Sequence, residues 1–265
     1  MSKSQRYADS VLQVSVGHQV PGGGAEYARE KIDRALAFAP EPVLSARVRL
    51  TAHHDHAASN PVIAQANVNM DGRAVRVQVA ATTGREAVDL LEVRLKERFE
   101  RLARHWEAIR GRNAVAGPRE WRHGGAPSTR LPYFPRAFDE REVLRRKSFA
   151  LSEETCEEAA FDMDMMDYDF HLFAESGSGV DSVLYRREGS YRLAQLDPCP
   201  DTVIRGTAAI AVSAFPAPTT NVEGAIERLE LTGWPFVFFQ DRDTHRGCVL
   251  YHRYDGHYGL LTPAA

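Results

Sequence analysis

The segment 84–110 carries the pattern that most restricts how this chain can fold. Successive residues of an α-helix are rotated by about 100°, and in that register the large apolar residues of the segment share one narrow stripe. The stripe consists of Val88, Leu91, Leu95, Phe99, Leu102 and Trp106. Because such a stripe must be covered by other apolar residues, the segment is predicted to be a long helix with one face in a hydrophobic core.

The charged residues of this predicted helix are separated by sign. One flank of the stripe carries Arg94, Arg98, Arg101 and His105, and the other carries Glu86, Asp89, Glu97, Glu100 and Glu107. Two interpretations are open at this point. Charged helices usually present a solvated face with mixed ion pairs, but a row of arginines can also follow a phosphate backbone.

Charge is distributed unevenly between the two halves of the chain. The 265 residues have a net charge of −3, with 43% hydrophobic and 26% charged residues, which is ordinary for a globular protein. Residues 1–130 contain 20 Lys and Arg against 14 Asp and Glu, whereas residues 131–265 contain 13 against 22. A nucleic-acid-binding surface is therefore expected in the basic N-terminal half and not in the acidic C-terminal half.

The sequence also restricts the compartment and the chemistry of the protein. Its three cysteines, Cys156, Cys199 and Cys248, are scattered and favour a reducing compartment without a disulfide framework. No signal peptide or membrane-spanning stretch is visible, so a cytoplasmic location is expected. The Gly22–Gly24 turn lacks the Lys-Ser/Thr of a phosphate loop, and no Gly-x-Ser-x-Gly or Cys-x-x-Cys motif occurs. We therefore predict no enzymatic activity and no cofactor.

Residues 1–110 are predicted to form one α+β domain. The predicted strands span 11–16, 43–51, 61–70 and 74–81, and the predicted helices span 25–38 and 84–110. Asp71–Gly72 joins the last two strands in the manner of a hairpin turn. The order β-α-β-β-β-α places both helices on one face of a four-stranded sheet.

The C-terminal part contains an internal repeat. Residues 111–142 are rich in Gly, Pro and Arg and are predicted to be a linker. Beyond the linker, a shift of 66 residues superposes Phe149 on Phe215, Phe170 on Phe236, and Val183–Tyr185 on Val249–Tyr251. The repeat predicts two modules, 143–199 and 207–265, each a short helix followed by strands. Because a unit of about 50 residues buries too little surface to be stable alone, the two small α+β modules are predicted to pack together.

Two clusters contain side chains of the type that bind metal ions. The first is His53, His54, Asp55 and His56. It lies in a predicted turn, where adjacent residues rarely converge on one metal. The second is Asp162, Asp164, Asp167 and Asp169. It lacks the glycine and the terminal glutamate of a calcium loop, and its alternation with apolar residues favours a half-exposed strand. No metal site is predicted.

Several short motifs of the two modules carry a family resemblance. The first module contains Arg145–Phe149 (RRKSF), Glu157–Ala159 (EEA), Asp169–Phe173 (DFHLF), Val183–Arg187 (VLYRR) and Gly189–Tyr191 (GSY). The second contains Phe236–Phe239 (FVFF), Val249–Arg253 (VLYHR) and Gly256–Leu260 (GHYGL). In this order the motifs resemble those of the long ribosome hibernation-promoting factors, the protein Y group, with the C-terminal module duplicated as in actinobacterial dormancy-associated forms. The order of the N-terminal elements is similar to the ribosome-binding domain of that family.

The resemblance implies a stress or dormancy protein that binds the small ribosomal subunit over the decoding region and excludes messenger and transfer RNA. The implied partners are 16S rRNA, ribosomal proteins of that subunit and the 70S ribosome, with no membrane and no cofactor. Basic residues of the N-terminal domain are the predicted contacts with RNA. They are Arg94, Arg98, Arg101, His105, Arg104, Lys96, Arg85, Arg29, Lys31, Arg34 and Arg76.

The resemblance also implies how the modules pair. Long members of the family pair their single C-terminal module with that of a second molecule. This chain holds both copies, so tethering favours pairing within the chain and a monomer is expected. The predicted pairing residues are Phe170, Phe173, Tyr185, Tyr191, Phe236, Phe239, Tyr251 and Tyr258. An alternative stays open, in which the protein is a stress-regulated protein-interaction factor that acts through its acidic modules.

Overall fold

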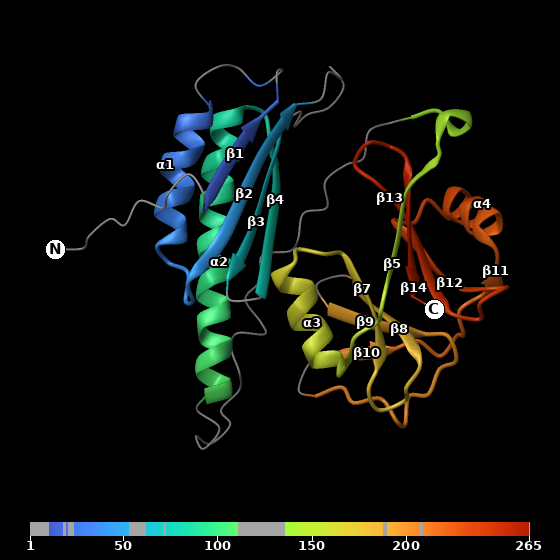
Figure 1. Cartoon of the computed structure of the whole chain (residues 1–265). Coiled ribbons are helices and arrows are strands. Elements are labelled where there is room, and N and C mark those ends of the chain that lie inside the picture. The colour runs from blue at the N-terminus through green and yellow to red at the C-terminus, as the bar shows by residue number, and fades with distance from the viewer. Residues whose placement is uncertain are drawn as a thin grey trace. The chain divides into compact units, whose positions relative to one another are not determined.

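The computed structural model of the chain (Figure 1) describes residues 11–17, 20, 24–52, 62–70, 73–110, 136–187, 190–206 and 209–264. Their contacts group them into an N-terminal unit and a C-terminal unit. Among the helices of these residues, none is long and apolar enough to cross a membrane. The His53–His56 cluster and the Asp71–Gly72 turn lie outside the described residues.

The N-terminal unit is a four-stranded sheet with both of its helices on one face (Figure 1). The strands lie in the order β1-β2-β3-β4, with β1 parallel to β2 and the other neighbours antiparallel. In chain order its elements are β1 (Leu12–Val16), α1 (Gly24–Leu36), β2 (Val43–Ala52), β3 (Val62–Met70), β4 (Arg73–Ala81) and α2 (Gly84–Arg110). This is the β-α-β-β-β-α arrangement predicted from the sequence, and the fold prediction is confirmed.

Buried and exposed residues alternate along the strands, so one face of the sheet belongs to the core and the other is not covered by the helices. Val48 and Leu50 of β2 are buried under the helices, whereas Arg47 and Arg49 are exposed on the other face. The apolar stripe of α2 is buried as predicted: Val88, Leu91, Leu95, Phe99 and Leu102 are each at most 1% exposed. The side chain of Trp106 lies beyond those that the structure describes.

The C-terminal unit contains two five-stranded sheets, each covered on one face by a helix. The first sheet has the order β10-β9-β8-β7-β6 and the second the order β11-β12-β13-β14-β5. In chain order the elements are a 3-10 turn (Phe138–Glu140), β5 (Val143–Phe149), β6 (Glu153–Glu154), α3 (Cys156–Met165), β7 (Phe170–Glu175), β8 (Asp181–Arg187), β9 (Ser190–Gln195), β10 (Ile210–Val212), β11 (Thr219–Thr220), α4 (Val222–Thr232), β12 (Phe236–Asp241), β13 (Gly247–His252) and β14 (Tyr258–Pro263).

Three hydrophobic clusters hold these layers together. The inner faces of the two sheets meet through Leu172 and Val183 of the first sheet and Phe238 and Val249 of the second. The outer face of the first sheet packs on α3, and the outer face of the second sheet packs on α4. The layers are therefore helix, sheet, sheet and helix, and the prediction that the two modules pack together is confirmed.

The acidic segment after residue 161 differs from its predicted structure. Its alternating pattern favoured a strand, but α3 continues through it to Met165. The reason is the burial of Ala159, Ala160 and Met163, because residues at these spacings share one face of a helix. Asp164 accepts hydrogen bonds from Arg186 and Tyr191, so its carboxylate has protein partners.

The two repeats exchange their first strands. β5 begins the first repeat, yet it pairs parallel with β14, the last strand of the second repeat. β10 begins the second repeat and pairs parallel with β9, the last strand of the first. The predicted limits 143–199 and 207–265 therefore describe repeats in sequence, whereas each folded sheet takes an edge strand from the other repeat. An open edge offers backbone donors and acceptors to any strand that can reach it, and either repeat can satisfy them.

Candidate nucleic-acid interface

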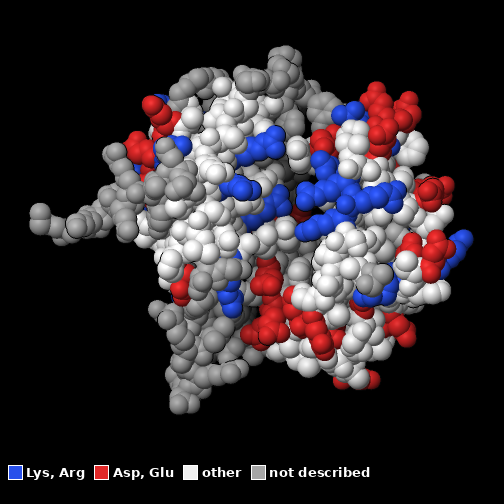
Figure 2. Space-filling model, in the orientation of Figure 1, with Lys and Arg blue, Asp and Glu red and all other residues white. Residues whose placement is uncertain are grey.

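The face of the N-terminal sheet that the helices leave uncovered is lined by polar and basic side chains. Strand register aligns them in two rows that run across all four strands. One row is Gln13, Arg47, Asn67 and Arg76, and the other is Ser15, Arg49, Gln65 and Gln78. We call these eight residues the open face. They include no Asp or Glu, and Figure 2 shows basic side chains gathered over this sheet.

The arginines of the open face differ in how they are held. Arg76 donates hydrogen bonds to the side-chain oxygens of Gln78 at 2.8 Å and Gln65 at 3.4 Å. Arg47 and Arg49 are exposed, and within the described residues they make no hydrogen bond or ion pair. A guanidinium group presents planar, paired donors that match the oxygens of a phosphate. The open face can therefore offer phosphate ligands without first breaking internal contacts of Arg47 and Arg49.

Sequence reasoning included Arg76 among the predicted contacts but missed Arg47 and Arg49. The signal was present, because both residues alternate with Val48 and Leu50 in the predicted second strand. In a sheet covered on one face, residues that alternate with buried ones must point to the other face. Arginines at such positions are better candidates for binding than arginines on a helix that packs against a neighbour.

The basic flank of α2 lies along β4. Arg94 is half-buried and donates a hydrogen bond to the backbone oxygen of Gln78 at 2.9 Å, so it fastens α2 to β4. Arg98 lies one helical turn further on. Arg101 is half-buried and Arg104 is exposed. The side chain of His105 is outside the described set.

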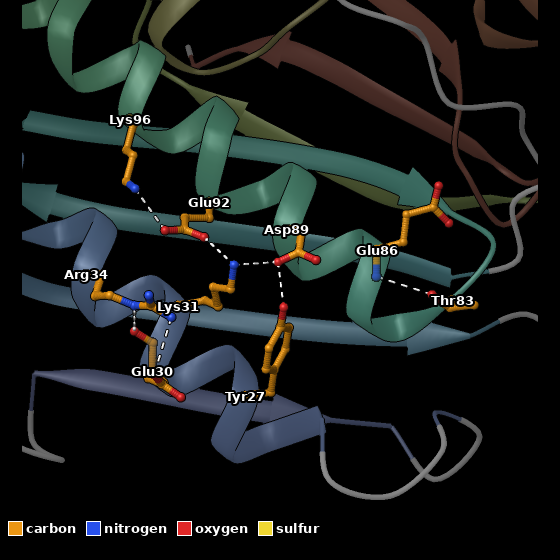
Figure 3. A network of polar contacts seen from close by, with 9 residues as sticks. All are labelled: Tyr27, Glu30, Lys31, Arg34, Thr83, Glu86, Asp89, Glu92 and Lys96. Carbon is orange, nitrogen blue, oxygen red and sulfur yellow. Dashed lines mark hydrogen bonds and ion pairs between the residues drawn. The ribbon is translucent and has the colours of Figure 1, made fainter.

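Two of the predicted contacts, Lys31 and Lys96, belong to a polar network between the helices (Figure 3). The ammonium group of Lys31 on α1 lies 2.8 Å from Asp89 and 3.0 Å from Glu92 of α2. Lys96 pairs with Glu92 at 2.8 Å, and the hydroxyl of Tyr27 donates to Asp89 at 2.7 Å. Hydrogen bonds to Asp89 and Glu92 raise the pKa of Lys31, and the bond from Lys31 lowers the pKa of Asp89. Lys31 therefore links α1 to α2, whereas Lys96 pairs with Glu92 within α2.

The other predicted contacts on the helices also have local partners. Arg29 donates to the backbone oxygen of Leu12 at 3.2 Å, and Arg34 pairs with Glu30 one turn away at 3.3 Å. Arg85 lies over the ring of Tyr27, 5.0 Å from its centroid. The predicted set is therefore divided: Arg76 belongs to the open face, and the remaining members belong to the helices on the opposite side of the sheet.

Four of the eight predicted pairing residues lie between the two C-terminal sheets. The ring of Phe170 is 4.7 Å from that of Phe236 and 5.6 Å from that of Tyr251, and Tyr185 is 5.6 Å from Phe236. The other four lie in the outer cores, under α3 or α4: Phe173, Tyr191, Phe239 and Tyr258. Strand geometry is the reason, because neighbours at odd spacing, such as Phe170 and Phe173, point to opposite faces of a sheet.

Neither a cluster of metal ligands nor a reactive form of the two buried cysteines is present among the described residues. Within them, no three His, Cys, Asp or Glu side chains gather as metal ligands would. Burial raises the pKa of both Cys156 and Cys248 to about 12. Both thiols are therefore protonated at neutral pH, whereas a reactive cysteine needs an accessible thiolate.

Comparison with known proteins places the chain in a family. The family described as "Sigma 54 modulation/S30EA ribosomal protein C terminus" matches twice, at residues 139–193 and 208–260, which confirms the predicted repeat. The chain is also 35% identical over 226 residues to a "Dormancy associated translation inhibitor" from two strains of Mycobacterium tuberculosis, CDC 1551 / Oshkosh and H37Rv. These matches cover 82% of this chain and 76% of each relative. The chain belongs to the family of long ribosome hibernation-promoting factors with a duplicated C-terminal module.

Two solved structures are similar to about a third of the chain. A ribosomal subunit interface protein from Coxiella burnetii is 17% identical, with a TM-score of 0.28, and the match covers 34% of this chain and 94% of that protein. The N-terminal domain of Protein Y from Thermus thermophilus is 21% identical, with a TM-score of 0.24, and the match covers 33% of this chain and 96% of that domain.

Proposed function

We propose that this protein is a ribosome hibernation factor. It binds the small ribosomal subunit near the decoding region and reversibly inhibits translation under stress or dormancy. The observation that carries the proposal is the 35% identity, over 82% of the chain, to a protein named as a translation inhibitor. The open face supports it, because three arginines and no carboxylate on a rigid sheet suit a polyanionic partner.

The proposed interaction is with the backbone of 16S rRNA. Arg47 and Arg49 contact phosphates, and the amide side chains beside them, Asn67 among them, donate to phosphate or 2′-hydroxyl oxygens. Such contacts read the shape of a folded RNA and carry little sequence information. Because each neutralised phosphate releases counterions, binding is expected to weaken steeply as salt rises.

Sedimentation with purified ribosomal particles tests this proposal. The full chain is mixed with 30S subunits, 50S subunits or 70S ribosomes at low and at near-physiological salt, and the pelleted fraction is measured. We expect it to pellet with 30S and 70S particles and to inhibit translation in a purified system. Pelleting with 50S subunits alone would contradict the small-subunit site. Failure to pellet with any particle would favour the alternative, a protein-interaction factor.

The C-terminal unit leads to a separate prediction about assembly. Both sheets of the pair come from one chain, and each takes its edge strand from the other repeat. The inner face of each sheet is therefore already covered, and neither module requires a module of a second molecule. We expect a monomer by light scattering up to micromolar concentration. On a sucrose gradient, ribosomes loaded with the protein should migrate as single particles. A stable homodimer together with a ribosome-dimer peak would contradict this prediction.

A further inference from the structure

Residues that are equivalent in the two repeats meet at the interface between the sheets. Phe170 and Phe236, which are 66 positions apart, have ring centroids 4.7 Å apart. The contact of Phe170 with Tyr251 is repeated as the contact of Phe236 with Tyr185, and both centroid distances are 5.6 Å. Reciprocal contacts of this kind are the signature of a two-fold, isologous interface. The sheets therefore pair as the subunits of a symmetric dimer would, although they belong to one chain.

One pair of equivalent positions breaks this symmetry. Asp181 begins β8 and Gly247 begins β13, again 66 positions apart. The Asp181 side chain is 8% exposed, and its Oδ2 accepts hydrogen bonds from the backbone N–H of Gly247 and from Nε of Arg246, both at 2.8 Å. Its Oδ1 accepts from Nη2 of Arg246 at 3.1 Å. The first repeat has Val180 at the position equivalent to Arg246.

The space at Gly247 admits no side chain. A Cβ atom built there would lie 2.9 Å from the Cβ of Asp181 and 2.9 Å from a ring carbon of Phe238. Real Cβ atoms essentially never approach other heavy atoms so closely. The interface thus has an aspartate on one side and, at the equivalent place on the other side, a position that only glycine fits.

We infer that Asp181, Arg246 and Gly247 restrict each sheet to pairing with its unlike copy. In a pair of two first-repeat sheets, a second aspartate would occupy the place of Gly247. Two carboxylates would then collide in a buried site that holds no cation. In a pair of two second-repeat sheets, the Gly247 N–H and the Arg246 guanidinium would both lose their acceptor. The preference for the unlike pair therefore arises as much from the free-energy penalty on the two like pairs as from the favourable contacts in the unlike pair.

This inference deepens the proposed monomeric state and does not depend on ribosome binding. Like pairing is the way in which modules of two chains would otherwise join, since it brings identical surfaces together. Unlike pairing between two chains uses the same contacts as unlike pairing within one. The chain connecting Gln195 to Ile210 favours the intramolecular form, because it raises the local concentration of the partner sheet.

Four versions of the full chain test the inference, because both like arrangements can be built inside one molecule. Arg246→Val with Gly247→Asp creates the first-with-first arrangement. Val180→Arg with Asp181→Gly creates the second-with-second arrangement. All four substitutions together exchange the unlike pair between the modules. Stability of the C-terminal unit is measured by urea titration with hydrogen exchange in β8 and β13, and the oligomeric state by light scattering.

Each double variant is expected to lower the folding equilibrium constant of the C-terminal unit at least about tenfold, because hydrogen bonds to a charged group are lost. The fourfold variant restores the aspartate acceptor, although the ring of Phe238 still crowds the side chain at 247. It is therefore expected to lose clearly less stability than the sum of the two double variants, because non-additivity of this sign measures a direct interaction. If the fourfold variant loses the sum of the two double variants, or if either double variant is as stable as the natural chain, the inference is overturned.

Discussion

Replacing Glu175 by alanine is expected to lower the free energy of unfolding of the C-terminal unit by about 3 kcal/mol. Glu175 lies at the end of β7 and is fully buried. Its carboxylate accepts hydrogen bonds from the backbone N–H groups of Gly177, Ser178 and Ile204 and from the hydroxyl of Ser178, at 2.7–3.1 Å. The variant leaves these donors without an acceptor. Urea denaturation measures the loss of unfolding free energy, and a separate hydrogen-exchange experiment on β7 and β8 shows whether the loss is in this unit.

The second repeat supplies a matched control for this variant. Asp241 occupies the equivalent position at the end of β12 and accepts hydrogen bonds from Asp243 and Thr244, but it is only half-buried. Water can replace Asp241, so Asp241→Ala should cost about 1 kcal/mol or less. Glu175 also binds Ile204, in the connection between the repeats, and Asp241 has no such contact in the described residues. Equal losses from the two variants would contradict this explanation.

The effect of Glu175 should depend on pH. Burial by itself raises the pKa of this carboxyl, but the hydrogen bonds from Ile204, Ser178 and Gly177 outweigh burial and lower the pKa overall. A lowered folded-state pKa stabilises the fold fully above the unfolded value, about 4.3 for Glu, and this stabilisation is lost as the pH falls through the folded value. The difference between the natural chain and Glu175→Ala should therefore be constant near neutral pH and shrink below about pH 4.

Reversing the charge of Arg47 and Arg49 together is expected to produce the largest change in ribosome binding. Both side chains are exposed on the open face, so Arg47→Glu with Arg49→Glu should leave the fold intact. If each arginine neutralises one phosphate, affinity for 30S subunits should fall at least about tenfold at near-physiological salt. The slope of log K against log salt should decrease by roughly two. Titration of labelled protein with 30S subunits at four or more salt concentrations gives both quantities.

A variant on the opposite side of the same unit makes this measurement specific. Arg34 and Arg104 are exposed on the helices, so Arg34→Glu with Arg104→Glu changes the net charge by the same amount without touching the open face. We expect a smaller loss of affinity and a salt slope reduced by less than about one. If the helix variant has the larger effect, the interface is on the helices, and the open face is not the site.

Only part of the candidate site could be predicted from the sequence. A helical wheel identifies the flank of α2 that carries Arg94 and Arg101, but it does not show what lies opposite that flank. Lys31 was a plausible phosphate contact until the packing of α1 on α2 placed it between two carboxylates. Arg47 and Arg49 were missed for a different reason. They become candidates for binding only when it is recognised that the helices cover one face of the sheet and leave the outward-pointing strand positions accessible.

By itself, the sequence determined the element order of the N-terminal unit, the core stripe of α2 and the existence of the two repeats. These features depend on local periodicity and on similarity along the chain, and both can be read without coordinates. It also indicated that the repeats need each other, because each is too small to form a stable core alone.

The tertiary structure alone decided which strand completes which sheet and how the sheets recognise each other. Backbone hydrogen bonds at a sheet edge are the same for every sequence, so nothing in residues 143–149 specifies β14 as the partner of β5. The contact of Asp181 with Gly247 could not be predicted from the sequence either. It joins two residues whose only relation in sequence is a 66-residue spacing, and its meaning depends on the two-fold axis that brings them together.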